Sequence, residues 1–241
     1  MSEFQTNKSV YVDEQAGLKA YVTNVYMRMG IGLLLTAVIA YAVHASGIVM
    51  RLAYTNPGML GMLYLGVVIA QLVIVFNLSR RILKMSTAQA QGMFYLYAAI
   101  TGLTFSVLLE AYDYGSVGIS FGFTAALFFS CAIIGHYTNT DMTRFSTLLG
   151  GGLIVLVLAS LLGVFIPAVR NSLLLTYLGI ILFLGITVYD AQRIKNIYYQ
   201  TNGGYGQEGA NLGIYGAFSL YLDFINIFLY ILRLFGNRNR R

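Results

Sequence analysis

Two aspartates interrupt long apolar stretches of this chain, and no other residues are better placed to do chemistry. Asp190 follows the run LLLTYLGIILFLGITVY, and Asp223 lies inside NLGIYGAFSLYLDFINIFLYILRLF. A carboxylate in hydrocarbon is costly, so such residues are rare, face the protein interior or a water-filled path, and usually mark function. We therefore expect Asp190 and Asp223 to form the functional centre.

If the two carboxyl groups share one poorly solvated site, their chemistry follows from electrostatics. They cannot both ionise at low cost, and they lose their protons in two coupled steps, so the pair responds to pH. The doubly ionised form attracts a cation. Calcium prefers about six to eight oxygen ligands, which is more than Asp190 and Asp223 supply. The pair therefore suits transient passage of calcium as a permeant ion, with no resident cofactor.

Nearby polar side chains are candidates for support of the pair. Asn226 follows Asp223 by about one helical turn and offers an amide oxygen. Tyr189 and Tyr221 precede the aspartates closely and offer hydroxyl donors.

Simpler interpretations remain open for other charged residues. Arg193 follows Asp190 by one turn, and an ion pair between them at the membrane interface would contribute only a few tenths of a kcal/mol. Glu110 closes a third apolar run, where it either faces solvent or lines an outer vestibule.

The composition predicts that these residues lie in a lipid bilayer. Of the 241 residues, 58% are hydrophobic and 10% are charged, and the mean hydropathy is +0.71. Apolar runs of roughly 18 to 23 residues recur, and each is long enough to cross about 30 Å of hydrocarbon as a helix. We expect an all-α polytopic membrane protein with seven spans. The expected spans are 25–43, 59–78, 93–112, 117–136, 146–167, 172–191 and 212–235.

The domain organisation follows from these spans. We expect a cytoplasmic N-terminal segment at 1–24, a single transmembrane domain at 25–235 and a basic tail at 236–241. The short loops leave no room for a nucleic-acid module, so the net charge of +6 is expected to anchor loops to membrane lipid. No phosphate-binding loop, nucleophile elbow or zinc motif occurs, and we do not expect an enzyme.

Lys and Arg residues indicate the orientation, because they concentrate in cytoplasmic loops. A cytoplasmic N-terminus would leave only Arg51 and Arg170 in the opposite loops. The cytoplasmic side would then hold Lys8, Lys19, Arg28, Arg80, Arg81, Lys84, Arg144, Arg193 and Lys195. The arginine-rich tail favours a re-entrant last segment instead, but that apolar run is long enough to cross, and we keep seven spans.

The expected spans place the two aspartates at different depths. Asp190 lies about 26 Å along its helix from Leu173, near the cytoplasmic end, whereas Asp223 lies near the middle of the last span. Direct contact would require the helix that carries Asp190 to tilt, or the last span to begin above the membrane plane.

Several motifs together resemble those of a known family. The segments GITVYDAQRIKNIY (185–198) and GAFSLYLDFINIFLYILRLFGNR (216–238) are similar to paired signatures of the Bax inhibitor-1-like family, and TGLTFS (101–106) and GHYTNTDMTRF (135–145) are similar to further family segments. The likeness covers nearly the whole chain and is strongest to the bacterial inner-membrane branch.

This resemblance implies a seven-helix fold with the last helix at its centre. It also implies a pH-sensitive calcium leak gated by an aspartate pair, whose positions match Asp190 and Asp223. A basic residue at the end of the second helix is expected to act as a latch, and Arg80 and Arg81 are both candidates; the simpler alternative is that both anchor this loop among lipid headgroups. The expected location is the bacterial plasma (inner) membrane.

Two other function classes were weighed. The bacterial branch also resembles a modulator of the membrane-anchored AAA protease, so an interaction protein without transport is the main alternative. An intramembrane aspartyl protease would need glycines in a GxGD context, but Leu220, Tyr221 and Leu222 precede Asp223. We therefore favour a cation leak channel or transporter.

Overall fold

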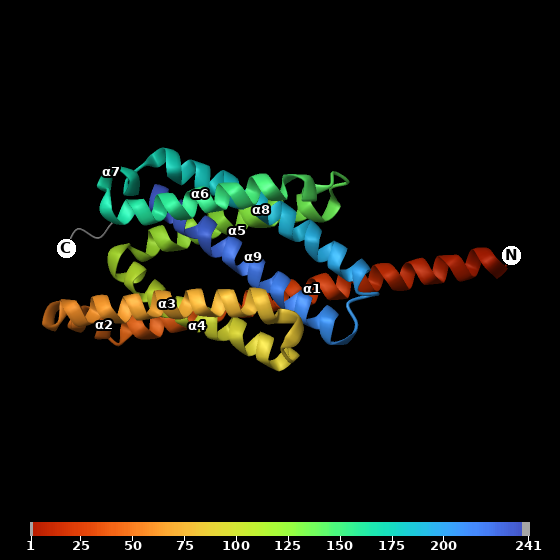
Figure 1. Ribbon diagram of the computed structural model, residues 1–241, viewed down its shortest axis with the longest axis horizontal. Coiled ribbons are helices and arrows are strands. Elements are labelled where there is room, and N and C mark those ends of the chain that lie inside the picture. Colours follow the sequence, from red (N-terminus) through yellow and green to blue (C-terminus); the bar gives the residue numbers. More distant parts are fainter. Residues whose placement is uncertain (1, 238–241) are drawn as a thin grey trace. The chain divides into compact units, whose positions relative to one another are not determined.

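The computed structural model describes residues 2–237, and every element in that part of the chain is helical (Figure 1). The predicted basic tail lies outside the described residues from position 238 onward. The elements are α1 (Ser2–Ala45), α2 (Ile48–Thr55), α3 (Pro57–Arg81), η1 (Ile82–Lys84), α4 (Thr87–Ala111), α5 (Tyr114–Tyr137), η2 (Met142–Phe145), α6 (Ser146–Phe165), α7 (Pro167–Arg170), α8 (Leu173–Gln200) and α9 (Gly206–Phe235).

Seven helices in the described part of the chain are long and apolar enough to cross a membrane, which confirms the predicted all-α fold. These segments are Glu14–Ala45, Pro57–Lys84, Thr87–Ala111, Tyr114–Tyr137, Met142–Phe165, Leu173–Gln200 and Gly206–Phe235. The last helix is the most buried of the seven: 56% of its apolar segment is buried, against 6% for α3. The predicted central position of the last helix is therefore also confirmed.

The predicted ends of the sixth and seventh helices were wrong. Helix α8 continues to Gln200 instead of ending near 191, and α9 begins at Gly206 instead of near 212. The added turns are amphipathic rather than uniformly apolar, and they bury Ile194, Ile197 and Asn211. A search for apolar runs finds the part of a helix that crosses the hydrocarbon, but it misses additional turns that have one polar face.

Local sequence signals set several helix ends. Pro57 occupies the first turn of α3, where its missing N–H costs nothing. Before α4, the Gln89 N–H donates to Ser86 Oγ (3.3 Å) and the Ser86 N–H donates to Gln89 Oε1 (3.1 Å), which makes a capping box. Asp113 caps α5 by accepting the Ser116 N–H at 2.9 Å.

Helix contacts divide the chain into two compact units, and each is described by itself. The first unit comprises Met1–Leu108 and Arg193–Ser219, and the second comprises Leu109–Gln192 and Leu220–Arg241.

Polar contacts and aromatic packing hold the first unit together. The Thr36 hydroxyl of α1 donates to the Ala98 carbonyl of α4 at 2.9 Å. The Gln71 amide of α3 donates to the Thr101 hydroxyl of α4 at 3.0 Å, and these two helices run side by side in Figure 1. Phe218 of α9 packs on Phe94 of α4, with ring centroids 5.7 Å apart. Hydrogen bonds of this kind stabilise helix pairs in lipid, where hydrophobic burial gives little advantage.

Small residues hold the second unit together. Gly135 of α5 lies so close to α8 that a methyl group there would collide with the Val188 carbonyl and the Ala191 side chain. Gly179 of α8 lies against the Tyr230 ring of α9 in the same way. These close approaches explain why glycines occur inside apolar helices that glycine would otherwise weaken.

We expect Gly135→Ala to destabilise the protein, because α5 or α8 must shift to admit the methyl group. The control is Gly122→Ala on the same helix, where a methyl group meets open space and alanine favours the helix by up to about 1 kcal/mol. The measurement is the temperature at which each detergent-purified variant loses its monodisperse elution peak. A Gly135→Ala midpoint equal to that of Gly122→Ala would contradict the close crossing.

Candidate functional site: a buried aspartate pair

Asp190 of α8 and Asp223 of α9 belong to the same unit, and both side chains are buried, with exposed fractions of 8% and 3%. Their charges are close enough to interact directly. The different membrane depths expected for the two aspartates stay a prediction. Because α8 runs on to Gln200 and α9 starts at Gly206, both aspartates lie well inside their helices.

The Asp223 carboxyl group has an uneven environment. Its Oδ2 atom is fully buried and has no hydrogen-bond partner. The side-chain hydroxyl of Thr187 interacts with the same carboxyl group. A buried polar atom without a partner costs about 1 to 3 kcal/mol, and such atoms in native folds often mark function.

Thr187 is the main site residue that the sequence analysis missed. It is fully buried on α8, one turn before Asp190, so the two side chains share a helix face. Its hydroxyl donates to the Phe183 carbonyl at 2.8 Å, which leaves its oxygen lone pairs to accept a hydrogen bond from a protonated carboxyl group. The spacing T-x-x-D was the signal available in the sequence.

An aromatic cluster from α5 and α9 packs beside Asp223. Phe224, the next residue along α9, contacts Phe128 with ring centroids 5.5 Å apart and Phe121 at 5.2 Å. Phe128 is fully buried. We call Phe121, Phe128 and Phe224 the aromatic cluster. The residue next to Asp223 on α9 therefore packs in apolar surroundings.

Gln192 fixes the chain just after Asp190 and was also missed. Its side-chain oxygen accepts the Met142 N–H at 2.8 Å, and its amide group donates to the Thr140 carbonyl at 2.8 Å. Both bonds bind the loop after α5 to α8. Gln192 thereby satisfies loop backbone groups that would otherwise be unpaired near the membrane.

The residues proposed to support the pair are placed differently. Asn226 lies on the Asp223 face of α9, and its amide group donates to the Leu222 carbonyl at 2.8 Å, so its amide oxygen is left as a ligand for a cation. Tyr221 is fully buried but lies two residues from Asp223, on nearly the opposite side of α9. Tyr189 is half-buried.

The other charged candidates have contacts of their own, or their roles remain predictions. The Arg193 guanidinium stacks over the Tyr215 ring at 5.3 Å, within the first unit. Glu110 is half-buried in the last turn of α4. Arg80 and Arg81 are exposed at the end of α3 in the first unit, so a latch to Asp190 stays a prediction.

The pair offers few oxygen ligands. No group of three or more His, Cys, Asp or Glu residues that could hold a metal occurs among the described residues. Two carboxyl groups, one threonine hydroxyl and one amide oxygen fall short of the roughly six to eight ligands that calcium takes. Such a site can share a proton or receive a cation that keeps part of its water.

Asp223→Leu should leave the stability unchanged or raise it, because it replaces a buried, incompletely bonded carboxyl group with an apolar group of the same branching. Asn211→Leu is the contrast. Asn211 is buried too, but its amide group donates to the Ile82 and Met85 carbonyls, both at 2.8 Å. Thermal unfolding in detergent should therefore show a clear loss for Asn211→Leu only. An equal loss for both variants would contradict an energetically costly Asp223.

Comparison with known proteins places this chain. The family model described as "Inhibitor of apoptosis-promoting Bax1" matches residues 18–240. The chain is 40% identical over 241 residues to "Inner membrane protein YbhL" of Escherichia coli strain K12, covering 99% of this chain and 100% of that protein. It is 34% identical to a protein of Rickettsia prowazekii over 234 residues, covering 97% of this chain and 95% of the relative. The chain therefore belongs to the Bax inhibitor-1 family of integral membrane proteins.

Proposed function

We propose that this protein passes cations, calcium foremost, across a bacterial inner membrane under the control of protons on Asp190 and Asp223. The observation that carries the proposal is the burial, inside apolar helices, of two carboxyl groups that lie near enough for their charges to interact. Ionisable residues at such positions mark ion or proton pathways far more often than they stabilise a fold. The inner-membrane location rests on the similarity to the Escherichia coli protein.

Proton and cation compete for the same two carboxyl groups. With one proton shared, the pair carries one negative charge, and the Thr187 hydroxyl, which donates to the Phe183 carbonyl, can accept the hydrogen bond of the protonated oxygen. When that proton leaves, two negative charges in a poorly solvated site repel each other and attract a divalent cation. Flux should therefore rise as the pH rises. Because the fixed ligands are few, the cation can leave again.

The aromatic cluster is the proposed barrier in the closed state. Asp223 is 3% exposed, and Phe224 beside it packs on Phe128. An apolar constriction of this kind blocks ions because they cannot shed their water there. Movement of α9 relative to α5 within this unit would open it.

The first test is calcium flux into proteoliposomes between about pH 5 and pH 8. The native protein should show flux that rises with pH, because the pair must lose its proton to take the cation. Asp190→Asn and Asp223→Asn each remove one titrating group, so the pH response should flatten. Asp113→Asn is the matched control, because Asp113 lies in a loop outside the spans, where bonds from Ser116 hold its pKa below the usual value.

Two results would contradict the proposal. The first is native protein that passes no cation at any pH, which would favour the alternative of an interaction protein. The second is a pH profile that is identical in the native protein and in both aspartate variants.

A second test addresses the barrier. Phe128→Ala should raise flux at the pH where the native protein is least active, because it opens the packing against Phe224. Phe128→Leu keeps most of the apolar volume and should raise flux less. Phe123→Ala is the control: Phe123 lies on the same helix, but it is 54% exposed and stacks on Phe235 instead. Equal leaks from Phe128→Ala and Phe123→Ala would place the barrier elsewhere.

A further inference from the structure

A basic groove opens between the end of α3 and the start of α4, in the first unit. It has a volume of about 950 Å³ and is lined by Asn77, Arg80, Arg81, Lys84, Met85, Gln89, Gly92, Met93 and Leu96. No carboxylate is among these lining residues. We propose that this groove binds the phosphate of an anionic phospholipid, with the lipid chain against its apolar wall.

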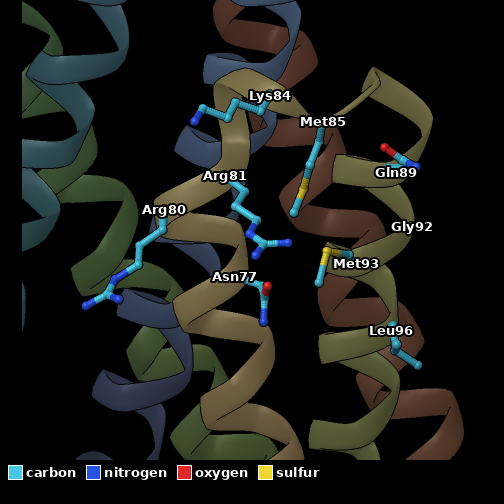
Figure 2. Close-up of a pocket in the computed structure, with 9 residues that line it drawn as sticks. All are labelled: Asn77, Arg80, Arg81, Lys84, Met85, Gln89, Gly92, Met93 and Leu96. Atoms are coloured by element: carbon cyan, nitrogen blue, oxygen red, sulfur yellow. The ribbon is translucent and has the colours of Figure 1, made fainter.

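Arg81 is the central cation of the groove. Figure 2 shows its guanidinium between the two helices, near Asn77 and opposite Met93, whereas Arg80 extends from the other side of α3 and Lys84 extends from η1 toward the same side as Arg80. Arg80 is held there by its own packing, because its guanidinium lies 5.8 Å from the Phe76 ring centroid. The planar fork of Arg81 is suited to bidentate bonds with phosphate oxygens.

Gln89 on the facing helix also lines the groove. The capping box occupies the side-chain oxygen of Gln89 with the Ser86 N–H at 3.1 Å. The amide NH2 group of Gln89 is left to donate to an anion. The segment that connects α3 to α4 is held in place by α9, because the Asn211 amide group donates to the Ile82 and Met85 carbonyls. The groove is therefore preformed before a phosphate group binds.

The position of the groove favours a lipid over a soluble anion. Its basic end lies where one apolar span ends at Lys84 and the next begins at Thr87, which is the level of lipid headgroups. Its apolar wall continues along α4 to Met93 and Leu96, and Leu96 lies about 14 Å along the helix from Thr87. A basic mouth followed by an apolar wall matches a phospholipid headgroup and the start of its chain.

Gly92 allows the shape of the groove to be tested without changing its charge. A side chain added at Gly92 would meet open space, so Gly92→Leu should fold normally and fill the groove. Leucine also favours a helix more than glycine does.

The experiment is native mass spectrometry of the full-length chain in a neutral detergent. The chain is titrated with dioctanoyl phosphatidylglycerol, dioctanoyl phosphatidylcholine or inorganic phosphate. We expect retention of the anionic lipid over the other two probes. Arg81→Gln should weaken it at least about tenfold, as expected for loss of a charge-assisted hydrogen bond, and Gly92→Leu should weaken it comparably.

Three variants separate the groove from general surface charge. Arg80→Gln should weaken binding by less than about threefold: Arg80 lines the groove, but its guanidinium lies over the Phe76 ring rather than between the two helices. Arg51→Gln, an exposed charge on α2, should leave binding unchanged. Arg81→Lys keeps the charge but not the planar fork, and it should give intermediate binding.

The outcomes decide the proposal. Equal losses for Arg80→Gln, Arg81→Gln and Arg51→Gln, with no effect of Gly92→Leu, would overturn it in favour of diffuse attraction. Displacement of the lipid by an equal concentration of inorganic phosphate would overturn the lipid assignment in favour of a soluble anion. These results do not depend on whether the aspartate pair conducts calcium.

Discussion

The constraint on which this fold depends is the need to keep two carboxyl groups out of lipid. A charge in hydrocarbon must be enclosed by protein or water, so the helix that carries Asp223 has to be surrounded by others. Helix α9 meets this requirement because 56% of its apolar segment is buried inside the protein. The close crossing at Gly135 and the packing of Phe128 on Phe224 enclose the same region.

The sequence alone predicted the features that depend on hydropathy. It located all seven spans and identified Asp190 and Asp223, because charged residues stand out in apolar runs. It did not predict how far α8 extends, because the turns after Asp190 are amphipathic and their burial depends on tertiary packing. Thr187 and Gln192 were missed because a threonine or a glutamine within a helix is unremarkable until its neighbours are known.

The adjacent arginines show a different limit of sequence reasoning. Arg80 and Arg81 have the same chemistry and adjoin in the chain, so no pattern distinguishes them. Adjacent residues on a helix point about 100° apart, and here one side chain lies over Phe76 while the other enters the groove beside Met93. The helix thus gives the two arginines different surroundings, although they look interchangeable in the sequence.

The lone cysteine has a practical consequence. Cys131 lies on α5 one turn before Gly135, on the same helix face, and it is half-buried. Because the chain contains one cysteine, a thiol-reactive fluorophore or spin label would attach at a single native position beside the crossing of α5 and α8. Spectroscopy on the unmodified sequence can therefore follow local movement of these helices, without first building a cysteine-free background.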